Sequence, residues 1–432
     1  MSIVSNNLKQ SIIWRGFYFI TLLLVNIVLS RFLKAEGAGV IFYLANLFSF
    51  GVLIFSFNLD GGFTFFSSSK LIKHHQLANL AVVWTIFFGL ITYFFLPIYF
   101  SKFDEFVFTE VNKASINGLY YIVGILLLNF FTALFYSLGN FVLPNIILGV
   151  TNLLLVALIY FGIKTNSSST NIINYYFQFI TFQGVAVVIA YYLYYKILPS
   201  FQFPSCKEFK ELFRYSSISL VGNFLFFFVY RLDYWFVKEF GNNIADLGNY
   251  IQSSKLSQLL LIAPQILASS IFPQLASGKN QEEIVETISR LCRIFSIIFL
   301  AIFIIILILG KWLFPFVFGS SFSNMYFPIL ILLPGIFCLS SSALLSAYFS
   351  GRKQNHINLY AAAFALMVMV AFTIIFKSQY TIYVAATISS IAYFAETLFC
   401  FYHYSKKASI HWKTIFNYSI NDWVWLKKLL FN

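Results

Sequence analysis

The sequence predicts an all-α membrane protein with about 12 transmembrane helices in two six-helix bundles. Composition, long apolar runs and the placement of Lys and Arg lead to this prediction. Of the 432 residues, 60% are hydrophobic and only 10% are charged, with a mean hydropathy of +0.81. Soluble domains carry about 25% charged residues. Too little polar surface is therefore available for a soluble domain of this size.

Twelve apolar runs have roughly the 20-residue length that crosses the hydrocarbon core of a bilayer. The first six are residues 11–30, 39–66, 77–100, 116–137, 141–163 and 172–195. The second six are residues 215–238, 247–275, 294–313, 325–349, 357–376 and 380–404. The ninth is the clearest, because "IFSIIFLAIFIIILILG" has Ser296 as its only polar side chain. The fourth and fifth are separated by only "LGN" at 138–140.

These runs divide the chain into a first bundle (1–195), a cytoplasmic linker (196–214), a second bundle (215–404) and a basic amphipathic tail (405–432). The tail mixes tryptophans with lysines, and either lies on anionic lipid or is a plain positively charged end. Glycines repeat at a nearly constant offset, since Gly39 and Gly124 match Gly248 and Gly335. If each half has six helices, an even number, then both halves enter the membrane in the same direction. This arrangement is called a parallel repeat.

Lys and Arg residues predict the orientation, because they are enriched in cytoplasmic loops. With the N-terminus in the cytoplasm, 18 of the 28 fall on the cytoplasmic side. They are Lys9, Arg15, Lys70, Lys73, Lys196, Lys207, Lys210, Arg214, Lys279, Arg290, Arg293, Arg352, Lys353, Lys406, Lys407, Lys413, Lys427 and Lys428. An even number of crossings places both termini in the cytoplasm.

Motifs for several kinds of chemistry are missing from the sequence. There is no G-x-x-x-x-G-K-[ST] phosphate loop, so ATP is not the expected energy source. The four cysteines lack metal-ligand spacing and suggest no disulfide framework. All five histidines fall on the predicted cytoplasmic side, and no outer loop is large enough to build an active site. We therefore expect neither an enzyme, nor a resident cofactor or metal, nor a nucleic-acid partner.

Charged residues inside the predicted spans are the candidate functional residues. A central Arg, Lys or Asp costs roughly 2.5–3.5 kcal/mol in a membrane helix. The six are Arg15, Asp60, Arg231, Asp233, Lys255 and Glu396. Arg231 and Asp233 are two residues apart, so they point to different sides of one helix. Arg15 and Asp60 lie at a similar depth, as do Asp233 and Lys255.

Two interpretations of these charges remain open. They could form interhelical ion pairs that only fix the register of the helices. Alternatively, Arg231, Asp233 and Lys255 carry a net positive charge and could bind an anionic headgroup, with Tyr234 stacking on a sugar ring. Helix breakers accompany several of these residues, which is typical of transporter binding sites. They are Gly61–Gly62, Pro264, Pro273 and Pro334–Gly335, and they predict interruptions in the second, eighth and tenth runs.

Several motifs together resemble the polysaccharide and O-antigen flippases. Those proteins usually have Arg-x-Asp near the outer end of helix seven and Gly-x-Tyr at the start of helix eight, matched here by Arg231/Asp233 and Gly248/Tyr250. A proline then closes helix eight, as Pro273 would here. The segment "SRFLKAEGAGVIFYL" contains Arg31 and is similar to their R-x-L-G…G turn, with Lys34 in place of the first glycine. "FPFVFGSSF" at 314–322 and "SGRKQNH" at 350–356 also fit.

This resemblance implies two six-helix bundles around a central cavity, as in the multidrug/oligosaccharidyl-lipid/polysaccharide exporter superfamily. It implies alternating access in the bacterial inner membrane, carrying undecaprenyl-diphosphate-linked O-antigen or other repeat units between leaflets. It also suggests an O-antigen polymerase and a chain-length regulator as partners, and leaves coupling to H⁺ or Na⁺ open. The candidate substrate-binding residues are Arg231, Asp233, Lys255, Arg15, Asp60, Arg31, Tyr234 and Glu396.

Two other functions remain as alternatives. The first is a cation-coupled exporter of drugs or small molecules with the same fold. Such relatives usually carry an acid in the first helix of a half, whereas the first helix here has Arg15. The second is a membrane enzyme of polysaccharide assembly, such as an O-antigen polymerase, which would need a large outer loop that this chain lacks.

Overall fold

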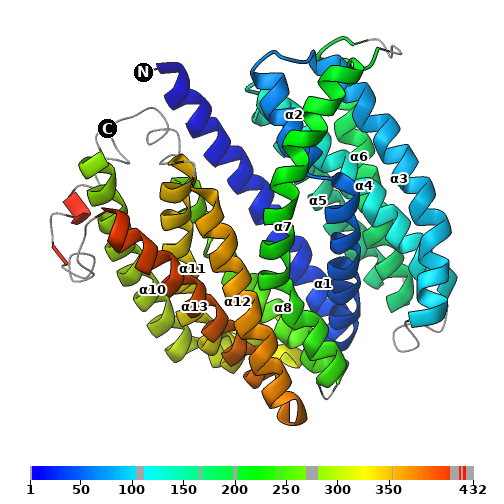
Figure 1. Ribbon diagram of the computed structural model, residues 1–432. Helices are drawn as coiled ribbons and strands as arrows, with labels where there is room; N and C mark the ends of the chain where they lie inside the picture. The colour runs from blue at the N-terminus through cyan, green and yellow to red at the C-terminus, as the bar shows by residue number, and fades with distance from the viewer. Residues whose placement is uncertain are drawn as a thin grey trace. The chain divides into compact units, whose positions relative to one another are not determined.

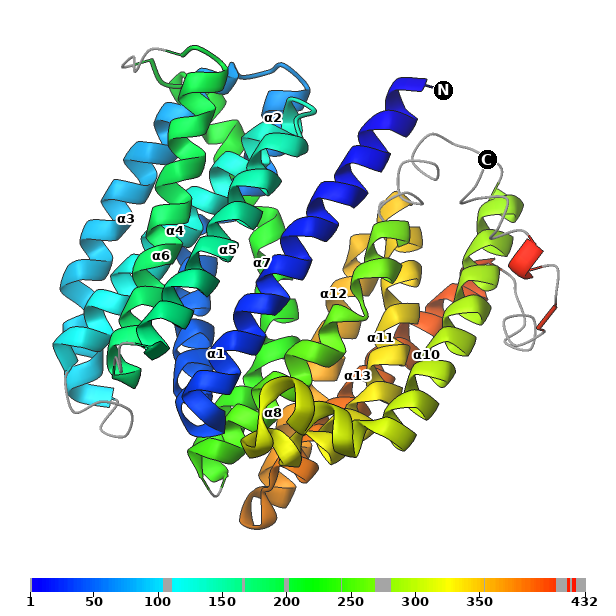
Figure 2. The ribbon, with the colours of Figure 1, turned by 180° about the vertical axis from the view of Figure 1, so that it is seen from behind.

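The computed structural model describes residues 2–103, 111–164, 168–197, 202–241, 243–268, 281–352, 354–408, 418–419 and 422–424. All regular elements in these ranges are helices (Figures 1 and 2). Ten of them are long and apolar enough to cross a membrane. The chain is therefore an all-α, multi-pass membrane protein. It divides into two compact units, Met1–Phe224 and Leu225–Asn432.

The first unit contains the N-terminal helices and the first part of α7. Its elements are α1 (Ser2–Ser56), α2 (Leu59–Ser68), α3 (His74–Phe103), α4 (Val111–Ser137), α5 (Val142–Lys164), α6 (Ser169–Tyr194) and α7 (Cys206–Phe240). α1 is really two arms, because Lys34 has a non-helical backbone with φ 56° and ψ −176°. The chain reverses there, so this single apolar stretch supplies two of the expected crossings (Figure 1).

The second unit contains the rest of α7 and the C-terminal helices. They are α8 (Ile244–Leu259), α10 (Gln281–Phe318), η1 (Ser320–Met325), α11 (Tyr326–Gly351), α12 (Asn355–Phe376), η2 (Lys377–Gln379) and α13 (Ile382–Ala408). The boundary between the units falls inside α7, because the first part of this helix packs on α2. Phe213 stacks on Phe57 with 4.6 Å between ring centroids, and Tyr215 stacks on Phe65 at 4.8 Å. The sequence-based limits of the bundles and linker stay a prediction.

Two of the three expected helix interruptions occur. Phe57 and Asn58, with φ of 51° and 54°, separate α1 from α2 just before Gly61–Gly62. α8 ends at Leu259, and Pro264 explains this end. Proline has no N–H to donate, and its ring clashes with the carbonyl four residues earlier, here that of Leu260. The other expected breaker of this run, Pro273, lies outside the described residues.

The expected interruption at Pro334–Gly335 was wrong, because α11 runs unbroken from Tyr326 to Gly351. α13 packs against α11 beside this proline. The Ser390 hydroxyl donates a 2.5 Å hydrogen bond to the Ile331 carbonyl, one turn before the proline. Pro334 leaves the Leu330 carbonyl without its usual N–H donor, and membrane helices tolerate such a proline when neighbouring helices and local adjustments compensate.

The two units share a packing feature. α4 packs extensively on α6, and α11 packs extensively on α13. A Cβ at Gly124 would lie 2.6 Å from the backbone of Ile180 in α6, and one at Gly335 would lie 2.6 Å from the Cα of Ser390 in α13. Small residues allow this close approach of membrane helices. The pair Gly124 and Gly335, matched by sequence offset, thus marks equivalent contacts in the two units.

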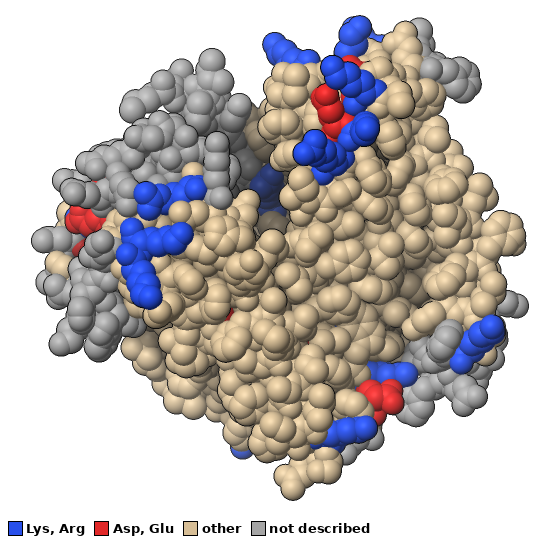
Figure 3. All heavy atoms as spheres, viewed as in Figure 1, with Lys and Arg blue, Asp and Glu red and all other residues tan. Residues whose placement is uncertain are grey.

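Charged side chains are concentrated near the helix ends. On the face in Figure 3, most Lys, Arg, Asp and Glu side chains lie there, and broad surfaces between them carry none. Large apolar side chains such as Leu300, Ile308 and Leu398 are exposed on the membrane-crossing helices. This distribution suits helices surrounded by lipid.

Candidate functional site

The last third of α7 carries the two charges that the sequence singled out. Asp233 is 1% exposed, whereas Arg231 is only half-buried. Positions i and i+2 lie on different sides of a helix, so the two side chains do not share an environment. That the two residues have different roles stays a prediction.

Asp233 is held by hydroxyl groups from two other helices. The Tyr250 hydroxyl of α8 donates to Asp233 Oδ2 at 2.5 Å, and the Ser389 hydroxyl of α13 donates to the same oxygen at 2.9 Å. The two hydroxyl oxygens are 3.1 Å apart. Asp233 Oδ1 is buried and has no hydrogen-bond partner among the described residues. A buried carboxylate oxygen without a donor is costly, so this group suits a site that takes up a proton or a cation.

Arg231 lies next to Tyr234, one turn further along α7. Its Nη1 lies 3.4 Å from the Tyr234 hydroxyl, and its guanidinium carbon lies 5.4 Å from the centroid of that ring. Tyr234 is fully buried and meets Tyr250 edge-on, with centroids 6.1 Å apart. The Arg231 guanidinium is thus positioned by the Tyr234 side chain and forms no ion pair with the Asp233 carboxylate.

Lys255 does not balance Asp233 as the sequence suggested. It lies on α8 (Ile244–Leu259). No ion pair joins Asp233 to Lys255 within the described part of the chain. The expected ion pair is replaced by the hydroxyl groups of Tyr250 and Ser389. Asp233 is thus held by hydroxyl groups and not by a basic side chain.

A second buried acid, Glu396, lies on the same face of α13 as Ser389. The Ser342 hydroxyl of α11 donates to Glu396 Oε1 at 3.2 Å, while Oε2 has no partner among the described residues. Tyr393 lies between Ser389 and Glu396 along this face, and its buried hydroxyl also lacks a partner there. Spacings of i, i+4 and i+7 place all three on one side of a helix. Buried polar atoms therefore follow α13 for about two turns.

The predicted residues of the first unit have separate surroundings. The Arg15 guanidinium lies 4.4 Å from the centroid of the Tyr136 ring and 5.6 Å from that of Phe141. Asp60 is in the first turn of α2, where the helix dipole favours a negative charge. No ion pair between Arg15 and Asp60 is present in the described ranges. Arg31 is exposed on α1, three residues before the bend at Lys34.

Sequence reasoning missed the hydroxyl partners of the acids. In the sequence, Tyr250 stands out only as part of the Gly-x-Tyr motif, and Ser389 gives no signal because serine is common in these helices. Ser389 lies 156 positions from Asp233, and no spacing rule links residues so far apart. No cluster of three or more His, Cys, Asp or Glu side chains in the described residues could hold a metal ion.

A family profile for polysaccharide biosynthesis proteins matches residues 28–327 of the chain. This is more than half of its length. The chain belongs to the polysaccharide biosynthesis protein family.

Among curated proteins, this polysaccharide biosynthesis family member is similar to a probable low-salt glycan biosynthesis flippase of Haloferax volcanii. The two are 24% identical over 250 residues, which cover 57% of this chain and 52% of the relative. The match thus spans about half the length of that flippase.

Solved structures extend the likeness of the fold over nearly the whole chain. The lipid II flippase MurJ, in an inward closed conformation, matches with a TM-score of 0.73 at 13% identity, covering 98% of this chain and 93% of MurJ. An inward-facing multidrug resistance transporter of the MATE family and the MOP superfamily matches with a TM-score of 0.70 at 15% identity, covering 93% and 96%. The family member thus has the fold shared by MOP-superfamily flippases and exporters.

Proposed function

We propose that the protein is a flippase for lipid-linked polysaccharide repeat units, such as undecaprenyl-diphosphate-linked O-antigen units, in the bacterial inner membrane. The observation that carries this proposal is the family match over residues 28–327. The similarity to a probable glycan biosynthesis flippase supports it. The cargo would have a polyprenyl tail, a doubly anionic diphosphate and a polar glycan, and would move by alternating access. An O-antigen polymerase and a chain-length regulator are the proposed protein partners.

Arg231 is the proposed contact for the anionic part of the cargo. Its guanidinium is half-buried, held beside Tyr234, and not neutralised by Asp233. Arginine offers a planar fork that can bind a phosphate or a sugar carboxylate through two parallel hydrogen bonds. Lys255, on α8 of the same unit, is a second basic candidate. The candidate residues of the first unit, Arg15, Arg31 and Asp60, are proposed to contact the cargo as well.

Asp233 and Glu396 are proposed to couple the cycle to H⁺ or Na⁺. Each has one oxygen bonded to a hydroxyl group and one without a donor. Uptake of a cation would neutralise a buried negative charge that is otherwise costly. Its release would restore attraction to Arg231, so occupancy of the acid could change how strongly the arginine holds an anion.

The second candidate function is cation-coupled export of a small molecule. The fold match to a multidrug resistance transporter favours it, and so does the presence of buried acids in the second unit. The positive charge of Arg231 argues against a cationic drug as cargo, since like charges repel. These two candidates predict different cargoes.

Complementation of a deletion strain separates the two candidates. The deletion should abolish long surface polysaccharide, and lipid-linked repeat units should accumulate. Arg231→Ala should fail to restore the polymer at normal membrane protein level, and Arg231→Lys should restore only part of it, because lysine lacks the planar fork. Arg214→Ala, which removes an exposed arginine from the same helix, is the matched control and should complement.

Normal surface polysaccharide in the deletion strain, together with raised sensitivity to cationic drugs, would support the exporter instead. Full complementation by Arg231→Ala at normal protein level would mean that Arg231 only fixes helix register. These two results are independent, so the cargo and the site are tested separately.

A further inference from the structure

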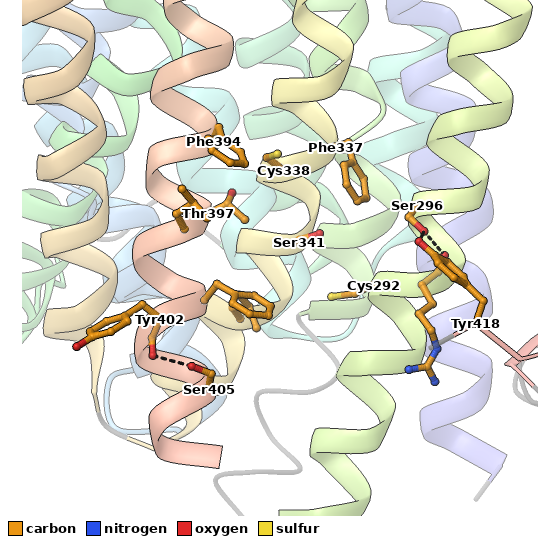
Figure 4. Close-up of a pocket in the computed structure, with 14 residues that line it drawn as sticks. Cys292, Ser296, Phe337, Cys338, Ser341, Phe394, Thr397, Tyr402, Ser405 and Tyr418 are labelled. Atoms are coloured by element: carbon orange, nitrogen blue, oxygen red, sulfur yellow. Dashed lines mark hydrogen bonds between the residues drawn. The ribbon is translucent and has the colours of Figure 1, made fainter. Parts of the chain in front are cut away.

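The second unit contains a cavity that is separate from the surroundings of Asp233. Its volume is about 470 Å³, and side chains of α10, α11 and α13 line it (Figure 4). The lining is mainly apolar, with Phe337, Leu345, Phe394 and Phe401 among its residues. Binding pockets for small ligands typically measure about 300–1,000 Å³. The cavity is thus large enough to hold part of a hydrocarbon chain.

A buried arginine lies at the rim of this cavity. Arg293, near the start of the membrane-crossing part of α10, is only 8% exposed. Its Nε and Nη2 donate to the two oxygens of Asp422 at 2.7 and 2.9 Å. Arg290 is further away, with its Nε 3.9 Å from Asp422 Oδ1. A guanidinium group that binds a carboxylate through two parallel bonds can bind a phosphate in the same way.

Asp422 belongs to the C-terminal tail and not to the helices that form the cavity. It is 4% exposed, and the hydrogen bonds from Arg293 lower the pKa of its carboxyl group. Asp422 therefore remains ionised when bound at physiological pH. In this conformation, a tail carboxylate fills the anion-binding side of Arg293.

A second tail residue, Tyr418, closes one side of the cavity. Its hydroxyl oxygen lies 2.8 Å from that of Ser296 on α10 (Figure 4). Tyr418 also lines a neighbouring cavity of about 600 Å³, together with Ser296, Leu300 and Phe337. Both cavities therefore share Tyr418 as a lining residue, together with Ser296 and Phe337.

We propose that this cavity and Arg293 form a binding site for an anionic glycerophospholipid, which exchanges with the tail residues Tyr418 and Asp422. One acyl chain would occupy the cavity, and the phosphate would take the place of the Asp422 carboxylate on Arg293. The exposed apolar side chains Leu300, Phe394 and Leu398 lie beside the cavity on membrane-crossing helices. A lipid could thus enter directly from the bilayer.

The charge of the chain favours an anionic lipid over a zwitterionic one. Its net charge is +13, and basic residues near a membrane surface attract anionic headgroups. The tail carboxylate competes as part of the same chain, which gives it a high effective concentration. Removing its charge should therefore strengthen lipid binding by about tenfold, the amount expected for losing one charged hydrogen-bonded competitor.

Native mass spectrometry of the full chain in detergent tests the proposal, with phosphatidylglycerol and phosphatidylcholine of the same acyl chains as probes. Asp422→Asn should raise retention of phosphatidylglycerol about tenfold over the parent protein and leave phosphatidylcholine unchanged. Glu286→Gln is the matched control, because Glu286 pairs with Arg290 one turn from Arg293 but does not line the cavity. It should leave both lipids unchanged.

Arg293→Gln, alone or combined with Asp422→Asn, should abolish the preference for phosphatidylglycerol. Equal retention by the parent and Asp422→Asn would overturn the proposal, as would an equal rise for both lipids. Inorganic phosphate at millimolar concentration should not displace the lipid. Its displacement would mean that Arg293 is an anion site without a lipid chain.

Cys338, which lines the cavity, gives a second readout that does not depend on Arg293. A variant with Cys206→Ser, Cys292→Ser and Cys400→Ser retains Cys338 as its one thiol. Adding Asp422→Asn should speed maleimide labelling of Cys338 in lipid-free detergent, and phosphatidylglycerol should then slow it several-fold. Labelling that phosphatidylglycerol does not change would contradict chain insertion. Neither readout involves transport. The lipid-site proposal can therefore be wrong while the proposed flippase function is right, and the flippase function can be wrong while the lipid site is right.

Discussion

At the scale of single residues, Asp233 depends on hydroxyl donors, since within the described residues its carboxylate forms no ion pair with a basic side chain. A buried carboxylate loses water on all sides and needs compensating hydrogen bonds. Tyr250 and Ser389 supply them on one oxygen only. The stabilisation of the buried Asp233 carboxylate therefore depends largely on the hydroxyl group of Tyr250. The Tyr250 ring also packs edge-on against Tyr234.

Tyr250→Phe should destabilise the protein by about 1–3 kcal/mol, because it leaves a buried acceptor without its shortest bond. Tyr393→Phe is the matched control. It removes a buried phenol hydroxyl that has no partner among the described residues, so stability should be unchanged or slightly raised. Thermal unfolding of the purified protein in detergent measures both. Equal losses for the two variants would show that the Tyr250 hydroxyl contributes nothing specific.

The direction of these side chains could be predicted from sequence, but their partners could not. The spacing of Arg231 and Asp233 is a local property of one helix, and it correctly placed them on different sides. The partner of Asp233 depends on how three helices meet, and charge balance wrongly suggested Lys255. The pair Arg293 and Asp422, 129 positions apart, gave no sequence signal, since one is near a predicted boundary and the other in a basic tail.

At the scale of helices, the bend in α1 places strain on one residue. Lys34 has φ 56° and ψ −176°, close to a region that only glycine adopts without cost. The flippases that this segment resembles usually have a glycine at this place in their R-x-L-G…G turn. The resemblance thus showed where a turn occurs, and the structure shows that lysine keeps the backbone conformation suited to glycine.

Lys34→Gly should stabilise the protein by about 1 kcal/mol, since relief of backbone strain exceeds the entropy that glycine adds to the unfolded chain. Lys34→Ala provides the control, because it removes the same exposed side chain but keeps the Cβ. Only the glycine variant should unfold at a higher temperature in detergent. A gain of the same size for alanine would assign the effect to the lysine side chain instead of the backbone.

The paired helix contacts of the two units are equally sensitive to added volume. Gly335→Ala should cost about 1–3 kcal/mol, because its Cβ would lie 2.6 Å from the Cα of Ser390 and neither helix backbone can yield cheaply. Gly124→Ala should cost a similar amount against Ile180.

Gly16→Ala is the control for both glycine variants. A Cβ at Gly16 in α1 meets nothing within 4 Å, and alanine favours a helix over glycine by up to about 1 kcal/mol. This variant should therefore be neutral or stabilising in the same thermal unfolding assay. If all three variants changed the unfolding temperature by the same amount, the close contacts of α4 with α6 and of α11 with α13 would not contribute specifically to stability.

At the scale of the whole molecule, apolar run length predicted the membrane crossings well. Each run reflects a requirement of the bilayer itself, namely that about 20 residues span its core. The breaks inside the runs were harder to predict, because a proline interrupts some membrane helices and is accommodated in others. α8 ends at Leu259, five residues before Pro264, whereas α11 continues past Pro334.

The orientation of the chain in the membrane follows from charge and can be tested with reporter fusions. Fusions after Lys70, Lys279 and the C-terminus should be active as cytoplasmic reporters, and fusions near Asp104 and Lys377 as periplasmic ones. The reason is that 18 of the 28 Lys and Arg residues fall on one predicted side, which the positive-inside rule assigns to the cytoplasm. Lys70 follows α2, and Lys377 begins η2 after α12. Lys279 and Asp104 lie outside the described residues, so the fusions there also test the count of crossings. If the C-terminus were periplasmic while Lys70 was cytoplasmic, the chain would cross the membrane an odd number of times after α2. The predicted topology of twelve transmembrane helices would then be wrong.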